Sequence, residues 1–169
     1  MRSSLAALLV LASACAYGFA GGGLPNEIKT VAVLPFENQT TDPTVAQEAN
    51  RSVRAALEQR LGLRDATEAR ADVVVRGTVR RYEPDQPIGY RGTGTGIGQQ
   101  RGGQVEVSKR LLQLSIDLEM IRKDNGDNLL RRKTFAVDAQ YDPGREADGR
   151  RTAFQFLIDE IVKEAQSQW

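Results

Sequence analysis

The sequence predicts an α+β two-layer sandwich, in which two helices cover one face of a four-stranded, mostly antiparallel sheet in the chain order βαβββα. Segments of alternating or continuous apolar residues predict the strands, and two segments with apolar residues at helical spacing predict the helices. An amphipathic helix must cover apolar sheet surface, which favours both helices on one face. With 169 residues, 40% of them hydrophobic and 27% charged, the chain has the size and composition of one folded domain.

The first predicted strand and helix lie in the N-terminal half of the chain. Residues Ile28 to Phe36 are apolar on both alternating faces, which is typical of a central strand. Asp42 and Pro43 are typical of a helix start, and Gly62 is typical of a helix end. Between them, apolar residues recur at helical spacing, at Val45, Ala49, Val53, Ala56, Leu57 and Leu61.

The segment from Asp72 to Tyr82 predicts the second strand, with Arg76 and Arg80 on the face opposite Val73, Val75 and Val79. The next segment, Glu83 to Gly103, is rich in Pro, Gly and Gln and lacks periodicity. We expect either a long mobile loop or a hairpin tip with a poorly fixed register. Its glycines match neither a dinucleotide-binding fingerprint nor a Walker A motif, so we do not expect a nucleotide site.

The third and fourth strands form a predicted hairpin. Residues Gln104 to Arg122 alternate, and the turn signal Asn125-Gly126 leads into a fourth strand from Asn128 to Ala139. One face of the third strand is apolar, with Leu112, Leu114, Ile116, Leu118 and Met120. Asp117 and Glu119 lie on its other face, where we expect solvated side chains rather than a catalytic pair. The closing helix is predicted by a second apolar stripe, formed by Phe154, Leu157, Ile158, Ile161, Val162 and Ala165.

The residue types present exclude several functions. The chain has no histidine, which excludes Ser-His-Asp and Cys-His catalysis, and one cysteine, which cannot form an internal disulfide or a Cys-rich metal site. The 23 Lys and Arg residues nearly balance the 22 Asp and Glu residues, so global charge does not predict a nucleic-acid partner. We therefore expect a binding domain that is not an enzyme and has neither a cofactor nor a metal.

The N-terminus resembles the signal of a bacterial lipoprotein. Residues 1–14 contain a positive start and a short apolar run that ends in small residues, directly before Cys15. The resemblance implies that residues 1–14 are a removed signal peptide, that Cys15 carries lipid, and that residues 15–27 tether a single domain of residues 28–169. The alternative is an ordinary signal peptide that leaves an unmodified thiol. Ala16 after the cysteine implies sorting to the outer membrane by the rule known for enteric lipoproteins.

The stretch from Cys15 to about Leu61, which includes Val-Ala-Val-Leu-Pro-Phe-Glu-Asn at residues 31–38, resembles the lipopolysaccharide-assembly lipoprotein family (LptE). The predicted element order is similar as well. The resemblance implies a lipid-anchored accessory subunit on the periplasmic side of the outer membrane, which plugs a β-barrel translocon (LptD-like) and binds lipopolysaccharide. Similar residues also occur in curli-secretion lipoproteins and TolB-like domains, so another envelope lipoprotein, including an oligomeric secretion-pore component, is the alternative.

Basic residues recur on the second and fourth predicted strands. Arg76, Arg80, Arg132 and Lys133 are the candidate lipopolysaccharide-binding residues, because a guanidinium can donate two hydrogen bonds at once to a phosphate. Six others could extend this surface, namely Arg81, Arg91, Arg101, Lys109, Arg110 and Arg131. The equal alternative is that these charges keep sheet edges and solvent faces soluble.

Overall fold

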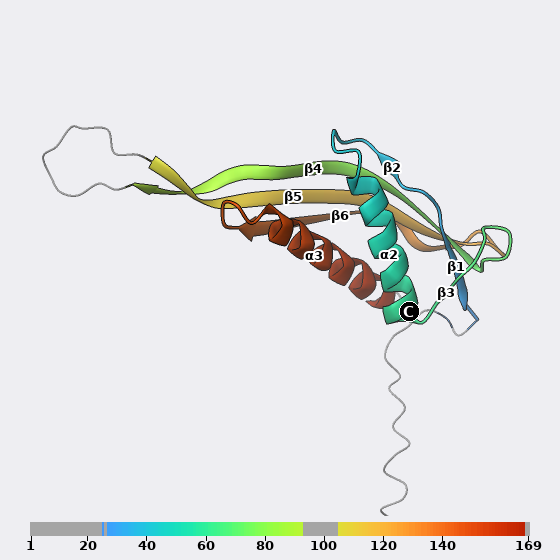
Figure 1. Ribbon diagram of the computed structural model, residues 1–169. Helices are drawn as coiled ribbons and strands as arrows, with labels where there is room; N and C mark the ends of the chain where they lie inside the picture. Colours follow the sequence, from blue (N-terminus) through green and yellow to red (C-terminus); the bar gives the residue numbers. More distant parts are fainter. Residues whose placement is uncertain (1–24, 26, 93–104, 168–169) are drawn as a thin grey trace, which may run out of the picture.

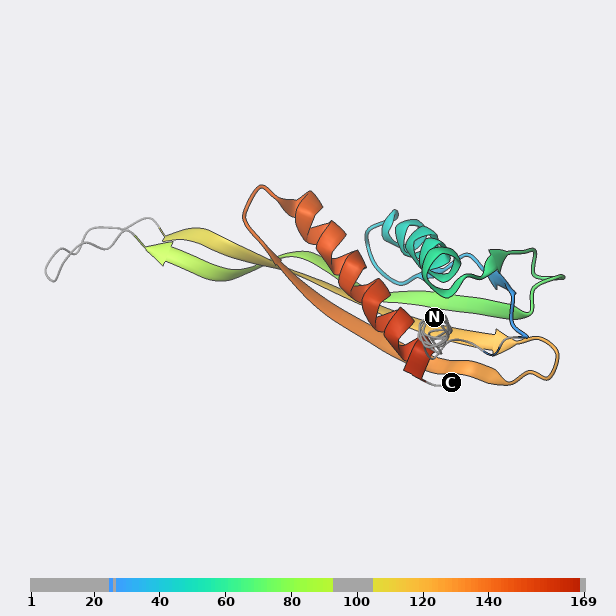
Figure 2. The ribbon, with the colours of Figure 1, turned by 90° about the horizontal axis from the view of Figure 1, so that it is seen from below.

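Two helices lie on one face of a long twisted β-sheet (Figures 1 and 2), in a computed structural model that describes residues 25, 27–92 and 105–167. The predicted α+β class and the two helices are confirmed. The elements are β1 (Thr30–Val33), β2 (Glu37–Asn38), α2 (Val45–Leu61), β3 (Arg64–Asp65), β4 (Val73–Gly92), β5 (Val105–Arg122), β6 (Asn128–Tyr141) and α3 (Glu146–Ser167).

The sheet is mixed and has six strands, in the order β3-β1-β4-β5-β6, with β2 pairing with β4 beyond the end of β1. The strands β4, β5 and β6 are antiparallel neighbours, whereas β1 runs parallel to β3 and β4, and β2 runs parallel to β4. The predicted four-stranded arrangement therefore lacked β2 and β3. Each of these has two residues, which is too short to produce an alternating pattern.

Helix α2 begins and ends near the predicted signals. The Asp42 carboxylate accepts hydrogen bonds from the backbone N–H groups of Thr44 and Val45, at 2.7 and 3.2 Å, so it satisfies donors that the first turn leaves unpaired. At the other end, Gly62 adopts φ 69°, a left-handed conformation that favours glycine, and its N–H bonds to the Leu57 carbonyl. The helix begins at Val45, two residues later than a start at Pro43 would give.

The core lies between the sheet and the two helices. The five apolar residues predicted on one face of β5 are all at most 1% exposed, and Val73, Val75 and Val79 of β4 are fully buried beside them. Both predicted helical stripes face this layer: Val45, Ala49, Val53, Ala56 and Leu57 of α2 and Phe154, Leu157, Ile161, Val162 and Ala165 of α3 are buried. The apolar residues whose spacing predicted each of these elements are therefore the residues that it buries.

Strands β4 and β5 continue beyond the other strands as a two-stranded extension (Figure 1), which we call the ribbon and define as residues 88–92 of β4 and 105–109 of β5. Strand β6 starts to pair with β5 only at Arg110, opposite Tyr141. The loop predicted over Glu83–Gly103 is thus wrong for its first part, which is strand. Register shifts along the ribbon agree with the hairpin interpretation. Residues 93–104 lie outside the described part of the chain.

Candidate binding surfaces

The predicted lipid attachment point, Cys15, and most of the tether lie outside the described residues, so their assignment stays a prediction. Neither α2 nor α3, the helices of the described residues, has the length and apolar character that a membrane span requires. Among the same residues, no three Cys, Asp or Glu side chains form a group that could hold a metal ion.

Arg76 and Arg80 lie on the face of β4 opposite the helices, as predicted. Arg80 is bonded on both sides: its Nε donates to Asp117 Oδ2 at 2.7 Å, and its Nη1 donates to Gln39 Oε1 at 2.7 Å. Arg76 is exposed and lies opposite Glu119 in the register of β4 and β5. The open face of the sheet therefore offers guanidinium groups that are already flanked by carboxylates.

Asp117 is buried, which corrects the expectation of a solvated side chain. It is 7% exposed and accepts hydrogen bonds from Arg80 and from Thr134, the latter at 2.6 Å. Its cross-strand neighbours are Thr78 and Thr134, so polar side chains from both adjacent strands, β4 and β6, cover it on the open face. Alternation along one strand predicts the face of a residue but not which neighbours cover it.

Lys133 lies on the other side of the sheet from Arg76 and Arg80. It pairs with Leu118, a core residue, and its Nζ lies 2.6 Å from Glu164 Oε2 of α3. Arg132 belongs to β6, but its side chain is outside the described part. The residues Arg76, Arg80 and Lys133 therefore do not form a single basic surface, because Lys133 alternates in phase with the core residues Phe135 and Val137 and so lies on the helix side of the sheet.

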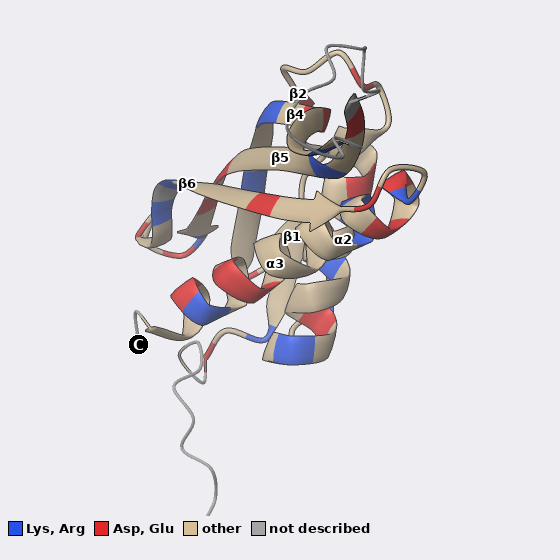
Figure 3. Ribbon diagram, turned by 90° about the vertical axis from the view of Figure 1, so that its left-hand side faces the viewer, with Lys and Arg blue, Asp and Glu red and all other residues tan. Residues whose placement is uncertain are grey.

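Several other predicted cations are also paired with acids. Lys109 lies 2.7 Å from Asp142, Arg110 bonds to Asp85, and Arg81 lies 3.7 Å from Glu83. Arg91 and Arg131 are exposed, and Arg101 lies outside the described residues. Figure 3 shows the two signs intermixed along the strands and helices rather than gathered by sign. This distribution weakens the prediction of a strongly basic patch.

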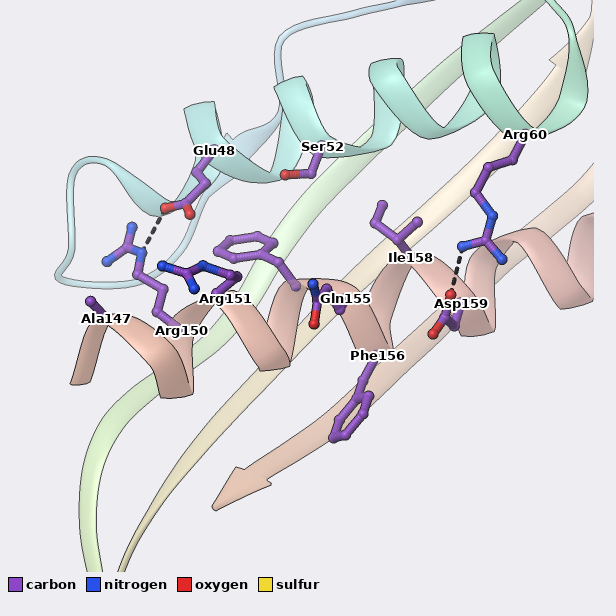
Figure 4. A pocket seen from close by; sticks show the side chains of 11 residues that line it. Glu48, Ser52, Arg60, Ala147, Arg150, Arg151, Gln155, Phe156, Ile158 and Asp159 are labelled. Atoms are coloured by element: carbon purple, nitrogen blue, oxygen red, sulfur yellow. Dashed lines mark hydrogen bonds and ion pairs between the residues drawn. The ribbon is translucent and has the colours of Figure 1, made fainter. Parts of the chain in front are cut away.

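A groove of about 810 Å³ runs between α2 and α3 on the surface of the helical layer. Ion pairs bridge the two helices along it (Figure 4): Arg150 donates to Glu48 at 2.6 Å, and Arg60 donates to Asp159 at 2.6 Å. Phe154, Phe156 and Ile158 add apolar lining, and Phe156 is 47% exposed. The groove combines an apolar lining with charges that are already paired.

Arg150 is the most connected side chain in this region and was missed from the sequence. Besides Glu48, its guanidinium donates to Asp42 at 3.0 Å, to the Tyr82 hydroxyl at 2.9 Å and to Thr44 at 3.0 Å. It also lies 5.0 Å from the centre of the Tyr82 ring, a cation–π distance. Of this network, the sequence indicated only Asp42, as the start of a helix.

The network around Arg150 changes the ionisation of its members. Hydrogen bonds from Thr44, together with those from Arg150, lower the pKa of Asp42 from 3.8 to about 2. Burial raises the pKa of the Tyr82 hydroxyl. Asp42 therefore stays a carboxylate and Tyr82 a neutral donor or acceptor throughout the neutral range, and the junction of α2, α3 and β4 is a fixed charge arrangement rather than a proton-transfer site.

The comparisons with known proteins concern the whole domain. The sequence model of the family described as lipopolysaccharide-assembly, LptE, matches residues 28–167. No curated protein matches the chain in sequence. A solved structure from Xanthomonas campestris has a TM-score of 0.55 to this chain, with 13% identity over 82% of each chain, so the two share a fold.

Two further solved structures are similar at a lower level. The PelC dodecamer from Paraburkholderia phytofirmans has a TM-score of 0.48 and 17% identity, covering 86% of this chain and 92% of that chain. A lipoprotein from Neisseria meningitidis has a TM-score of 0.45 and 13% identity, covering 80% of this chain and 96% of that chain.

Proposed function

Since this chain belongs to the lipopolysaccharide-assembly lipoprotein family, LptE, we propose that it is an accessory subunit of a lipopolysaccharide translocon. In this role it binds a large outer-membrane β-barrel partner as a plug and acts by shape and charge rather than by catalysis. The observation that carries the proposal is the family match, which extends over residues 28–167 and thus over the whole described domain except Pro25 and Glu27.

The proposed location follows from the N-terminal sequence. A lipid on Cys15 holds the domain at the periplasmic side of the outer membrane, because a multiply acylated N-terminus anchors a protein stably. The chain between Cys15 and β1 then serves as the tether. This arrangement raises the local concentration of the domain beside any partner in the same membrane.

Glycolipid contact is proposed for the open face of the sheet, at Arg76 and Arg80, with Arg132 and Lys133 as the remaining candidates. Arg76 is exposed, and the side chain of Arg80 is 41% exposed although it bonds to Asp117. A guanidinium that is already paired with a carboxylate can still donate its remaining N–H groups to a phosphate, since it carries five donors. Lys133 faces α3 and is the weakest of the four candidates.

Purification of the tagged full-length lipoprotein from its native membrane tests the proposed function. We expect one large β-barrel protein to copurify in a stoichiometric amount, and depletion of the lipoprotein to reduce surface lipopolysaccharide. A ring of identical copies without a barrel would instead support the oligomeric secretion-pore alternative. Turnover of an ester or glycan substrate would overturn the non-catalytic assignment.

The glycolipid contact has a separate test. The double variant Arg76→Glu and Arg80→Gln should weaken lipopolysaccharide binding at least tenfold in moderate salt, measured by fluorescence titration. Glutamine is chosen at position 80 because a second carboxylate beside buried Asp117 would destabilise the fold. The double variant Arg51→Glu and Arg70→Gln, at two exposed positions away from this face, lowers the net charge by the same amount and is the matched control. If the native protein, the open-face variant and the control bound lipopolysaccharide with equal affinity, the open face would not be part of the glycolipid site.

A further inference from the structure

The ribbon leaves one edge of β5 without a neighbouring strand. Among the described residues, β6 pairs with β5 from Arg110 onward, so Val105–Lys109 have β4 on one side and no strand on the other. An unpaired strand edge exposes a row of backbone N–H and C=O groups, which a further extended chain can satisfy. It is the same edge of β5 with which β6 pairs from Arg110 onward.

The two edges of the ribbon differ in their capacity to accept a strand. On the β4 side, the residues opposite the open β5 segment are Gly89 to Gly92, and their pairing with β5 shifts register on both sides of Gly89. Pro87, which lacks a backbone N–H, directly precedes the ribbon. Prolines and bulges are the features by which proteins protect edge strands from pairing. The β5 side, Val-Glu-Val-Ser-Lys at residues 105–109, has neither proline nor glycine. The β5 edge of the ribbon is therefore better suited to strand addition than the β4 edge.

Two exposed apolar side chains lie on the β4 strand of the ribbon, next to the open β5 segment. Ile88 is 43% exposed and Tyr90 is 61% exposed, and both lie on the ribbon; Phe156 of α3 is the only other large hydrophobic residue exposed to this degree among the described residues. Tyr90 pairs with Val107, in the middle of the open β5 segment. A strand added beside Val107 would gain apolar contacts as well as backbone hydrogen bonds.

We propose that an extended segment of the partner protein adds to the ribbon as a β-strand along Val105–Lys109 of β5. This inference rests on the proposed function, since the partner is the β-barrel subunit named there. A closed barrel wall has no free strand edge, so the segment comes from a loop or a chain terminus of the partner. Backbone pairing supplies the recognition, and the apolar side chains of the ribbon favour an apolar residue in the added strand.

A second copy of this chain fits the edge less well. Pairing of two β5 edges would join only the short segment Val105–Lys109 of each copy, whereas stable interfaces bury about 1,600 Å² in total. A short edge is sufficient when the same partner also contacts the rest of the domain and both proteins are held in one membrane. The short open edge therefore favours a partner that makes a larger contact elsewhere.

Site-specific photocrosslinking in intact cells tests this inference. A benzoylphenylalanine residue replaces Glu106 or Ser108 on the open β5 edge, or Asp85 or Gln86 on β4 as the matched control. We expect crosslinks from positions 106 and 108 to a loop or terminus of the barrel partner, at least tenfold more abundant than those from positions 85 and 86. Mass spectrometry of the crosslinked peptide identifies the segment.

A proline variant provides the second measurement. Val107→Pro should reduce the copurified partner at least tenfold, whereas Gln86→Pro, on the edge that already contains two prolines, should leave it unchanged. If Val107→Pro unfolds the ribbon, the photocrosslinking experiment, which keeps the rest of the sequence native, decides whether a strand is added. Copurification of the barrel without edge crosslinks would overturn strand addition and leave the proposed function standing. Crosslinks between two copies of this chain would also overturn it, and the absence of any barrel would refute the proposed function itself.

Discussion

Arg150 connects three elements through one side chain. Its partners are Asp42 and Thr44, which precede α2, Glu48 on α2, and Tyr82 on β4. The side chains of Arg150, Asp42 and Glu48 are between 23% and 33% exposed, so the ion pairs are screened less than pairs at a fully exposed surface. This residue therefore fixes the position of α3 against α2 and β4.

Replacing Arg150 should destabilise the domain. Arg150→Ala leaves two carboxylates close together without their cation, and we expect the free energy of unfolding to fall by about 2 kcal/mol. Arg150→Lys keeps the charge but cannot donate to all four groups at once. We expect its free energy of unfolding to lie between those of Arg150→Ala and the native protein. Urea unfolding followed by circular dichroism measures both. Equal stability of the Ala variant and the native protein would contradict this view of Arg150.

Asp42 should make stability depend on pH in the acid range. Its pKa is about 2 in the folded protein and 3.8 ordinarily, so its contribution is fully present above about pH 4 and is lost as the pH falls toward 2. Asp42→Asn keeps an acceptor for the first turn of α2 but removes the charge. We expect this variant to be less stable at pH 6 and to approach the native protein at pH 2.5, measured by urea midpoints. A constant difference at both pH values would exclude the charge effect.

At the scale of elements, close packing joins the start of α3 to the end of β6. A Cβ atom on Gly149 would lie 2.5 Å from Cδ1 and 2.7 Å from Cγ of the Tyr141 ring, so no larger residue fits without movement. The hydroxyl of the same tyrosine donates to the Pro84 carbonyl of β4. Gly149, Tyr141 and Pro84 thus connect α3, β6 and β4.

Gly149→Ala should lower stability although alanine is the better helix former. Overpacking against the tyrosine ring costs about 1–3 kcal/mol, and the gain in helix propensity offsets about 1 kcal/mol of this cost. Ala147→Gly, an exposed position in the first turn of the same helix, is the control and should cost less than about 1 kcal/mol through propensity alone. Thermal unfolding compares the two variants. A stabilised Gly149→Ala protein would show that the ring moves aside without cost.

The sequence predicted the elements whose pattern is local and missed the features that depend on distant partners. The apolar alternation in β5 and the helical stripes of α2 and α3 record burial directly, so the class and core followed from them. By contrast, Arg150 binds Asp42, which lies 108 residues earlier, and Asp117 binds Arg80, which lies 37 residues earlier. For residues 83–103 the sequence left a loop and a hairpin tip as alternatives, because Pro and Gly obscure the period of β4 beyond Tyr82.

At the scale of the whole molecule, the lipid proposed on Cys15 would determine where the domain acts. Cys15→Ser should abolish acylation and release the protein from the membrane fraction, because the acyl chains are the proposed anchor. Labelling with a palmitate analogue, followed by membrane fractionation, measures this effect. Ser13→Cys in the Cys15→Ser background is the control for thiol content and should remain unlabelled. A membrane-bound and unlabelled Cys15→Ser protein would contradict lipid anchoring.

The length of the ribbon has a geometric consequence. At about 3.3 Å per residue, residues 88–92 of β4 extend about 16 Å beyond the end of β6, roughly half the hydrocarbon thickness of a bilayer. The described ribbon therefore reaches only about half a bilayer thickness away from the domain body. Deleting one residue from each of its two strands would shorten this reach by about 3.3 Å.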